Sequence, residues 1–319
     1  MPGALRIGVL GCASIAERRM LPSMLAQPRV ELVAVASRHA EKAERFARLF
    51  GCEAVTGYER LLAREDIDAV YVPLPPSLHA EWVRRALLAG KHVLCEKPFA
   101  ATLAEAESAV ALARDRGLLV MESFMFLHHR QHAEVRRLLD EGLIGEPRGF
   151  SADFGIPLLD GGGGHASTLP EVAVYPIRVA EFFLGWELEV LGAYERCDAA
   201  GEFAVAGDAM LRAPSGVIAH LRYGLEHGYR AEYTWWGSAG TLTVRRAFST
   251  PDDHAPVLRV ECRSGVEDLV LKPDSQFVNI AGFFAEAVLD GGEFRTHADA
   301  ILRHAELLDR VRVAAQLGG

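Results

Sequence analysis

The stretch "LRIGVLGCASIA", residues 5–16, places a short apolar run directly before a glycine-led turn. The composition of residues 5–10 predicts a short buried strand. Residues 15–27 follow with a helical pattern, in which Pro22 lies early or introduces a bend. A strand, a tight turn and a helix in this order predict the start of a βαβ unit.

The same order of segments continues as far as residue 124. Thr102 and Glu105 have the spacing of a helix capping box. Regular alternation of strands and helices requires a parallel sheet covered on both faces. We therefore predict an α/β fold in which residues 1–123 form a doubly wound domain. The predicted strands are 5–10, 30–37, 68–76, 91–98 and 118–124, and the predicted helices are 15–27, 40–51, 78–90 and 102–117.

The pattern changes after residue 124. Short segments with alternating apolar and polar residues follow one another between turns, which predicts a large, mostly antiparallel sheet. We predict an α+β domain over residues 124–319, with a C-terminal helix able to pack back on the first domain. Its predicted strands are 147–156, 188–197, 204–213, 216–225, 231–238, 240–248, 257–263 and 267–273, and its predicted helices are 131–141, 172–184, 277–290 and 297–315.

Composition narrows the possible partners. The formal net charge of −9 over 319 residues argues against nucleic acid or an anionic membrane as the main partner. The apolar run at the N-terminus is too short for a signal peptide, and no run reaches the ~18 residues of a membrane span. The five cysteines lack CxxC spacing, so neither a disulfide framework nor a zinc site is expected. These features predict a cytoplasmic protein that acts on a small molecule.

The turn "GCASIA" resembles the dinucleotide fingerprint G-x-G-x-x-G/A. Gly11 supplies the tight turn, Ala13 replaces the second glycine, and Ala16 takes the helix-packing position. The alternative is a plain tight turn, but a strand before it and a helix after it favour binding of a pyrophosphate at the helix start. The residues predicted to contact the cofactor here are Gly11, Cys12, Ala13, Ser14 and Ile15.

The end of the second strand distinguishes between the two nicotinamide cofactors. An acidic residue there would bind the ribose 2′-hydroxyl of NAD, whereas this chain has Ser37 and Arg38. A hydroxyl and a guanidinium suit the 2′-phosphate of NADP. We therefore predict NADP(H) as the cofactor. The alternative is that Arg38 is only a solvated residue at the start of a helix.

Longer blocks of sequence resemble a known family. The blocks are "GVLGCASIAERRMLP", "VAVASR", "VPLPPSLHAEWVRRALLAGKHVLCEKP" and "MESFMFLHHRQHAEVRRLLDEGLIGEPRGFSADFGIP". They are similar to the Gfo/Idh/MocA family of NAD(P)-dependent oxidoreductases, whose E-K-P motif follows a Rossmann half at this distance. Further blocks, "VYPIR", "GLEHGY" and "GSAGTLTVRRAFSTP", resemble the NDP-hexose C3-ketoreductases of deoxysugar biosynthesis within that family.

The resemblance implies roles for two residues. Lys97 of "CEKP" would lie where nicotinamide meets substrate, and Tyr175 of "VYPIR" would be the proton donor. A phenol has a pKa of ~10, and a nearby ammonium would lower it. The alternatives are a solvated loop lysine and a core tyrosine. Around the cofactor we further expect contacts from Tyr58, Leu74, Pro75, His79 and Glu96, with Glu96 positioning either the cofactor or Lys97.

The substrate side of the predicted site is less regular. We expect substrate contacts from Lys97, Glu171, Tyr175, Arg178 and Tyr233, and Arg130 and Arg230 are further candidates for a sugar diphosphate. No metal is expected, because His128, His129 and His132 lack a carboxylate or cysteine at ligand spacing.

One segment departs from the family pattern. Where the family has a glycine-rich motif, this chain has "HASTLPEVA", and its glycines come earlier, at 161–164. Glu171 stands in place of an aspartate, and Ala173 in place of a glycine. A positioning group that moves by about 1 Å can cost ~10²-fold in rate. A different sugar, a different stereochemical outcome or a weakened enzyme are the open alternatives.

The resemblance implies NADPH-dependent reduction at C3 of a nucleotide-linked 3,4-diketo-2,6-dideoxyhexose, with dTDP as the expected nucleotide. A homodimer or homotetramer is expected, because one face of an antiparallel sheet needs a cover. Two alternatives remain: a family member that oxidises a free sugar, inositol or dihydrodiol, and a noncatalytic NADP-binding regulatory protein.

Overall fold

The computed structural model describes residues 3–157 and 169–317. The chain divides into two compact units, each made of two segments. The first unit contains Met1–Met125 and Phe277–Ala305, and the second contains Phe126–Gln276 and Glu306–Gly319. The C-terminal part of the chain therefore supplies helical segments to both units.

The first unit contains a six-stranded sheet in which every neighbouring pair of strands is parallel. The strand order is β3-β2-β1-β4-β5-β6. This order confirms the predicted doubly wound Rossmann sheet, and its topological switch point lies between β1 and β4. The strands are β1 (Leu5–Leu10), β2 (Val30–Ser37), β3 (Glu53–Thr56), β4 (Ala69–Val72), β5 (His92–Cys95) and β6 (Val120–Glu122).

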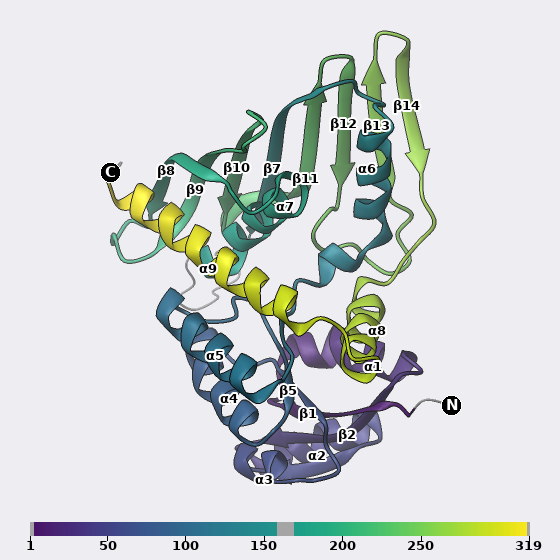
Figure 1. Ribbon diagram of the computed structural model, residues 1–319, viewed down its shortest axis with the longest axis vertical. Coiled ribbons are helices and arrows are strands. Elements are labelled where there is room, and N and C mark those ends of the chain that lie inside the picture. Colours follow the sequence, from purple (N-terminus) through teal and green to yellow (C-terminus); the bar gives the residue numbers. More distant parts are fainter. Residues whose placement is uncertain (1–2, 158–168, 318–319) are drawn as a thin grey trace. The chain divides into compact units, whose positions relative to one another are not determined.

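Helices of the first unit pack against this sheet and against one another. Figure 1 shows α4 (Pro76–Leu88) and α5 (Leu103–Arg116) side by side. The predicted capping box of Thr102 and Glu105 is present at the start of α5. The other helices of this unit are η1 (Ala16–Met20), α1 (Leu21–Ala26), α2 (Ala40–Phe50), α3 (Tyr58–Leu62), most of α8 (Gln276–Leu289) and the first part of α9 (Phe294–Leu317).

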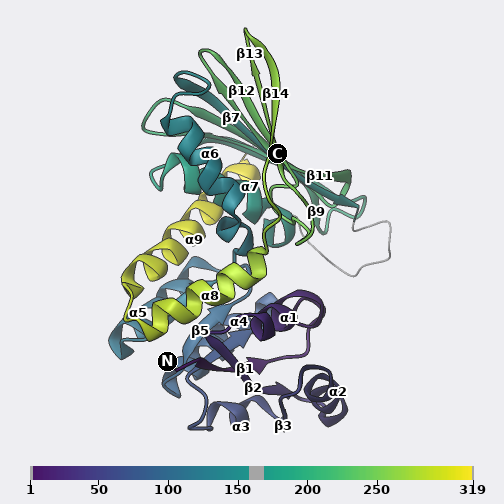
Figure 2. The same cartoon turned by 90° about the vertical axis from the view of Figure 1, so that its right-hand side faces the viewer.

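Helix α8 joins the first unit although it lies late in the sequence. Figures 1 and 2 show it beside α1. Nε2 of Gln27 donates to the carbonyl oxygen of Val278 at 3.3 Å. Arg29 and Asp290 form a 2.7 Å ion pair. The sequence pattern predicted this helix but not these partners.

Two details of the first unit differ from the sequence expectation. The predicted strand at 68–76 is only Ala69–Val72, because the proline-rich turn that follows has few backbone donors and α4 already begins at Pro76. Residues 53–62 form a short strand and a short helix that the pattern did not predict. Most residues of β3 are exposed, so its sequence lacks the alternation of apolar and polar residues that indicates a half-buried strand.

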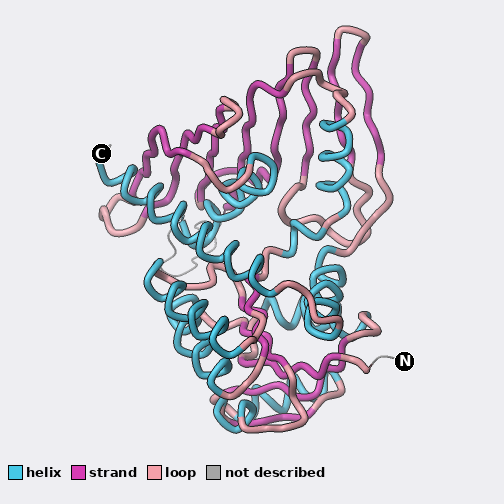
Figure 3. Tube along the Cα trace, viewed as in Figure 1, coloured by secondary structure: helices cyan, strands magenta, loops and turns pink. Residues whose placement is uncertain are grey.

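The second unit contains an eight-stranded sheet of order β14-β13-β12-β11-β7-β10-β9-β8. Among the described residues, the only parallel pair in it is β7 with β10, so the predicted mostly antiparallel sheet is confirmed. Figure 3 shows these strands as neighbouring magenta segments. The strands are β7 (Pro147–Pro157), β8 (Glu189–Cys197), β9 (Ala204–Arg212), β10 (Ile218–Gly224), β11 (Glu226–Gly237), β12 (Gly240–Arg245), β13 (Val257–Cys262) and β14 (Gly265–Val270).

The two faces of this sheet differ in burial. Phe150 and Phe154 of β7 are buried on the same face as α7 (Val174–Leu184), which packs against β7 and β10. The opposite face is more exposed, with 69% of Trp236 and 51% of Tyr194 open to solvent. Helix α6 (Arg130–Asp140) and the short 3₁₀ turn Met125–His128 precede the sheet. None of the helices in the described part of the chain is long and apolar enough to cross a membrane.

Candidate functional site

The turn after β1 has no room for a side chain at Gly11. Gly11 has φ +124°, and a Cβ built there would lie 2.9 Å from Cδ2 of Leu74. The backbone N–H of Gly11 donates to the carbonyl oxygen of Ala36 at 2.9 Å. The helical run begins at Ser14, directly after this turn. The turn therefore lies at the switch point, where its backbone N–H groups and the helix start fit a dinucleotide pyrophosphate.

The end of β2 brings four predicted cofactor residues together. Ser37 is buried, and its Oγ accepts a 3.2 Å hydrogen bond from the N–H of His39. Burial raises the pKa of Tyr58, and the positive charge of Arg38, together with a weaker contribution from its hydrogen bond, opposes that rise. Burial also raises the pKa of the Cys12 thiol. A hydrogen bond with Ser37 is the largest effect that acts to lower this pKa. Arg38 itself is exposed, so its guanidinium is accessible to a phosphate.

The sequence reasoning missed Lys42 in this group. The thiol of Cys12 lies 3.6 Å from the carbonyl oxygen of Lys42, and the Lys42 charge also lowers the pKa of that thiol. Lys42 lies in the first turn of α2, four residues after Arg38 in the sequence, and a basic residue this close to the end of the second strand was a signal that could have found it. The nearby Arg45 is already paired with both carboxylate oxygens of Glu17, at 2.7 and 2.6 Å.

The predicted nicotinamide residues lie at the ends of β4 and β5. His79 is completely buried in α4. Its Nδ1 is 2.7 Å from the carbonyl oxygen of Pro98, and its Nε2 is 2.6 Å from that of Leu74. Burial lowers the pKa of His79. The two carbonyl oxygens and the Glu96 carboxylate act to raise it, and the Lys97 charge lowers it further. Leu74, His79, Glu96 and Lys97 thus form one group in the first unit.

Two residues outside the prediction support this group. Tyr71 of β4 is completely buried and donates a 2.7 Å hydrogen bond to Oε1 of Glu96. Oε1 of Glu122, at the end of β6, accepts a 2.7 Å hydrogen bond from the N–H of Phe99. Lys97 is half-buried and lies between Glu96 and Phe99 in the chain. The carboxyl ends of three adjacent strands therefore contribute to the surroundings of the lysine.

Tyr175 lies in the second unit, on the first turn of α7, and is 7% exposed. Its ring is surrounded by aromatic side chains. The ring centroids of Phe154, Phe126 and Phe248 lie 4.8, 5.7 and 5.9 Å from that of Tyr175. This packing holds the phenol in a small range of orientations, as a positioned proton donor requires.

Tyr233 has a different environment from the other predicted substrate residues. It is 1% exposed, and its hydroxyl lies 2.9 Å from Nδ1 of His132. Nε2 of His132 lies 3.1 Å from the carbonyl oxygen of Ala247, which can only accept, so Nδ1 accepts from the tyrosine. Burial lowers the pKa of His132 to about 3 and raises that of Tyr233. The structure thus places the Tyr233 hydroxyl in the core of the second unit, bonded to histidine.

The remaining predicted substrate residues lie on separate elements. Glu171 is half-buried in the turn Leu169–Ala173 that leads into α7. Arg178 stacks over Trp186 at 4.6 Å, and its Nη1 is 3.4 Å from Oε2 of Glu181. The glycines at 161–164 and the residues "HAST" lie outside the described residues.

The other two arginine candidates also face carboxylates. Arg230 of β11 lies 3.3 Å from Asp153 and bonds Glu232, and Arg130 lies 3.8 Å from Asp274. The three arginines therefore have different carboxylate partners rather than one shared position.

Nδ1 of His129 accepts from the N–H of Gln131 at the start of α6. Within residues 3–157 and 169–317, no three acidic, histidine or cysteine side chains gather as a metal site.

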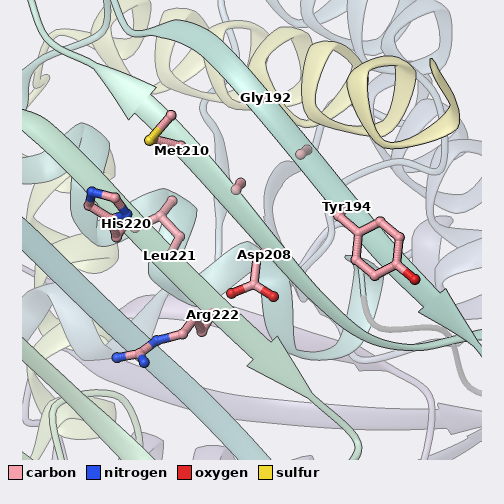
Figure 4. Close-up of a pocket in the computed structure, with 9 residues that line it drawn as sticks. Gly192, Tyr194, Asp208, Met210, His220, Leu221 and Arg222 are labelled. Carbon is pink, nitrogen blue, oxygen red and sulfur yellow. The ribbon is translucent and has the colours of Figure 1, made fainter. Parts of the chain in front are cut away.

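A shallow pocket lies elsewhere in the second unit, over β8, β9 and β10. Figure 4 shows Tyr194, Asp208, Met210, His220 and Arg222 projecting from these strands. None of the predicted site residues lines it. It lies on the more exposed face of the sheet, opposite the buried side chains of β7.

Comparisons with known proteins cover nearly the whole chain. A family model described as "Oxidoreductase family, NAD-binding Rossmann fold" matches residues 5–124, and "GFO/IDH/MocA C-terminal domain" matches residues 132–243. The dTDP-3,4-didehydro-2,6-dideoxy-alpha-D-glucose 3-reductase of Actinomadura kijaniata is 47% identical over 98% of this chain and 96% of its own. The enzyme of that name from Streptomyces antibioticus is 47% identical over 98% of both chains.

The solved structures that are similar to this chain include an enzyme of the same kind. A 3-ketoreductase from Actinomadura kijaniata, crystallised with NADP and TDP-benzene, has a TM-score of 0.94 at 46% identity and covers 98% of each chain. That enzyme has also been crystallised with one lysine replaced by alanine or glutamate, and with one tyrosine replaced by phenylalanine.

Proposed function

Because this chain belongs to the Gfo/Idh/MocA family of oxidoreductases, we propose that it is an NADPH-dependent sugar ketoreductase. Its substrate is a dTDP-linked 3,4-diketo-2,6-dideoxyhexose, which it reduces at C3. The observation that carries this proposal is the 47% identity to dTDP-sugar 3-reductases over 98% of the chain. Fold alone would not distinguish among the many sugar dehydrogenases that share it.

The geometry of the first unit supports the proposal that the cofactor is NADP(H). Gly11 keeps the turn after β1 free of a side chain, and Ser14 begins the helical run that would face a pyrophosphate. Ser37 and Arg38 are proposed to bind the ribose 2′-phosphate, with Lys42 adding positive charge. Cys12 and Tyr58 line the same end of the sheet, and Leu74, Pro75 and His79 are proposed to adjoin the nicotinamide end.

The reaction needs a hydride on carbon and a proton on oxygen. NADPH supplies the hydride when it is bound. Tyr175 is proposed to donate the proton to the carbonyl oxygen, which leaves a phenolate that regains a proton from water. Lys97 is proposed to hold the same oxygen through its ammonium group. A positive charge there stabilises the oxygen as it becomes negative and also favours the phenolate.

Substrate recognition is proposed to involve Glu171 and Arg178. Both precede or belong to α7, the helix that carries Tyr175, so their placement is coupled to that of the proton donor. For Tyr233 we propose an indirect contribution, because its hydroxyl is bonded to His132 in the core. The product would enter deoxysugar and antibiotic biosynthesis.

A homo-oligomer is also proposed. The open face of the second unit's sheet exposes 69% of Trp236 and 51% of Tyr194, which a second copy could cover. Light scattering of the purified protein would give its mass, and a monomer at micromolar concentration would contradict this part of the proposal.

The activity can be tested with the purified protein. A 2,3-dehydratase generates the unstable diketo sugar in the same vessel, NADPH is added, and its oxidation is followed by absorbance. Product analysis by mass spectrometry and NMR should find a new C3 hydroxyl on the dTDP-sugar. Free aldoses with NADP serve as the comparison. Oxidation of free aldoses, without turnover of the nucleotide sugar, would overturn the proposal.

A further inference from the structure

One of the three phenylalanines around Tyr175 lies outside regular secondary structure. Phe154 lies in strand β7, and Phe126 lies in a short 3₁₀ turn. Phe248 instead follows β12, in residues 246–250, which form no strand or helix. These residues are called the Phe248 loop below. Their conformation depends on individual hydrogen bonds, because no regular backbone pattern holds them.

Phe248 is completely buried and packs against the other aromatic side chains around the phenol. Its ring centroid lies 5.9 Å from that of Tyr175, and 5.3 Å from those of both Phe126 and Phe154. These separations fall within the ~4.5–7 Å of interacting aromatic pairs. A shift of the Phe248 loop would therefore open one side of the packing that orients the phenol.

The Phe248 loop begins in an unfavourable backbone conformation. Arg246 has φ +53°, and it is the only residue other than glycine with a positive φ in the described parts of the chain. Such a conformation persists only where the surrounding structure holds it. Here the hydroxyl group of Thr250 donates to the carbonyl oxygen of Arg246 at 2.6 Å. This hydrogen bond joins the last residue of the loop to its first.

Buried side chains of the second unit hold the same loop from outside. Nε2 of Gln131 lies 3.2 Å from Oγ1 of Thr250 and 3.4 Å from the carbonyl oxygen of Ala247. Nε2 of His132 lies 3.1 Å from that carbonyl oxygen. Nε2 of Gln276 donates to the carbonyl oxygen of Thr250 at 3.4 Å. Three side chains that are at most 1% exposed thus bind the loop.

Each donor in this network has a hydrogen for each acceptor. The Thr250 hydroxyl has one hydrogen, which goes to Arg246, so its oxygen accepts from the amide of Gln131. That amide has two hydrogens for its two acceptors. His132 is neutral, because burial lowers its pKa to about 3. Its single N–H donates to Ala247, and its other nitrogen accepts from a tyrosine hydroxyl. All of these hydrogen bonds can therefore form at once.

We propose that Thr250 is a positioning residue for the proton donor Tyr175 and acts through Phe248. Its hydroxyl holds the strained start of the Phe248 loop, and the loop keeps the phenylalanine ring against the phenol. Gln131 supports the same hydroxyl from α6. The inference rests on the proposed function, because it takes from there the role of Tyr175. It adds residues that act behind the phenol rather than on the substrate.

Exchange of the hydroxyl group tests this role. Thr250→Val keeps the branched shape and removes the hydrogen bond to Arg246, so we expect the loop to relax and kcat to fall ~10-fold. The KM for NADPH should not change, because the residues predicted to bind the cofactor lie in the first unit. Thr250→Ser keeps the hydroxyl and should restore most of the rate.

A second readout does not depend on turnover. The chain has seven tyrosines, so labelling with 3-fluorotyrosine gives few fluorine NMR signals, and Tyr175→Phe identifies the Tyr175 signal by its loss. The ring current of Phe248 acts on this signal from 5.9 Å. We expect the signal to shift in Thr250→Val and to stay near its wild-type position in Thr250→Ser.

Thermal unfolding verifies that each variant is folded. Gln131→Met removes the donor to the Thr250 hydroxyl from α6, and it should also shift the Tyr175 signal. It decides the inference if Thr250→Val is unfolded.

A double-mutant cycle tests whether Thr250 acts through the phenylalanine. Phe248→Leu removes the ring and should itself lower kcat. Adding Thr250→Val to Phe248→Leu should then cause little further loss, because the contact that the hydroxyl holds is already absent. Additive losses of kcat would show that Thr250 acts by another route and would overturn the inference.

Thr243→Val is the matched control. Thr243 lies in β12, and its hydroxyl lies 3.0 Å from that of Thr234 on the neighbouring strand β11. The next residue, Val244, is completely buried, so Thr243 points to the other face of the sheet. The same substitution there should leave the Tyr175 signal and kcat unchanged.

An unchanged Tyr175 signal in Thr250→Val, or an equal shift in Thr243→Val, would contradict the positioning role. If wild-type protein fails to reduce the dTDP-sugar, the proposed function fails, and the Tyr175 signal still decides whether Thr250 positions the phenol.

Discussion

The hydroxyl group of Tyr71 donates a 2.7 Å hydrogen bond to Oε1 of Glu96, the residue directly before Lys97. Tyr71 is completely buried in β4, so packing fixes its ring. A rigid core side chain thus orients a half-buried carboxylate in the loop that follows the neighbouring strand. This arrangement is typical of functional groups supported by the scaffold behind them.

Replacing this tyrosine tests that support. Tyr71→Phe keeps the ring and removes the donor to Glu96, so we expect kcat to fall ~10-fold because the loop after β5 that carries Lys97 is less well held. Tyr223→Phe is the matched control. Tyr223 is equally buried, and within the described residues its hydroxyl has no hydrogen-bond partner. Steady-state rates of the two variants should differ; equal rates would contradict the role of Tyr71.

Removal of the lysine charge should affect chemistry more than binding. Lys97→Met keeps much of the side-chain length without the ammonium, and we expect kcat to fall ~10²- to 10³-fold, as for loss of one donor to a developing oxyanion. Lys272→Met, at an exposed position, is the control and should have wild-type kcat. A Lys97→Met variant with more than about half of the wild-type kcat would remove Lys97 from the mechanism.

Tyr175→Phe should remove proton donation while the ring remains packed against Phe154 and Phe248. General acid catalysis contributes ~10²- to 10⁴-fold, and we expect a loss of kcat in this range. NADPH affinity, measured by fluorescence titration, and Tm should not change. Tyr194→Phe, on an exposed tyrosine, should retain full activity. Retention of activity by Tyr175→Phe would point to another proton donor.

Arg38→Ala should change the preference between the two cofactors. Loss of a charge-assisted bond to the 2′-phosphate costs about 1.5–3 kcal/mol, or roughly 10- to 100-fold in the KM for NADPH. The KM for NADH should stay the same, because NADH lacks that phosphate. Arg48→Ala removes an exposed arginine of the same helix α2 that pairs with Glu44 at 3.8 Å, and serves as the control. An equal effect on both cofactors would contradict the assignment.

Burial of His132 makes the stability of the protein depend on pH. Its pKa is about 3 in the folded protein, whereas an exposed histidine has a pKa of ~6.5. Between these values the unfolded chain binds the extra proton, so stability should fall as the pH is lowered from ~6.5 towards 3. In His132→Asn this slope should decrease by up to about 1.4 kcal/mol per pH unit, the value for one proton.

The measurement for His132 is the free energy of unfolding from denaturant titrations at several pH values. Other buried histidines, such as His79 and His129, also have lowered pKa values and contribute slopes of the same sign. The difference between wild type and His132→Asn isolates one residue. Parallel pH profiles for the two proteins would show that His132 is not the neutral core residue described here.

Much of the architecture could be predicted because strands and helices each have a characteristic spacing of apolar residues along the chain. The strands and helices up to residue 124, and the eight strands after residue 146, follow apolar patterns that need no knowledge of the fold. Strand β3 and helix α3 could not be predicted in this way. Strand β3 is mostly exposed, and α3, although it buries Tyr58, Leu61 and Leu62, has only five residues, too few for a helical period to be recognised.

The residues of the candidate site likewise fall into those that the sequence could single out and those that it could not. Motif spacing was sufficient to single out Gly11, Ser37 and Lys97, because each lies at or just after the end of a recognisable strand. Tyr71 and Glu122 could not be singled out, because inside or at the end of a strand they resemble any other strand residue. Their significance depends on the atoms they bind in the loop after β5.

The sequence by itself determined the two kinds of sheet, the glycine turn for a dinucleotide and the family to which the chain belongs. Tertiary structure alone decided that the Tyr233 hydroxyl binds His132, 101 residues away, and that His79 lies between the carbonyl oxygens of Leu74 and Pro98. The physical reason is that periodicity and turn chemistry act over a few residues, whereas these contacts join atoms that only the folded topology brings within 3 Å.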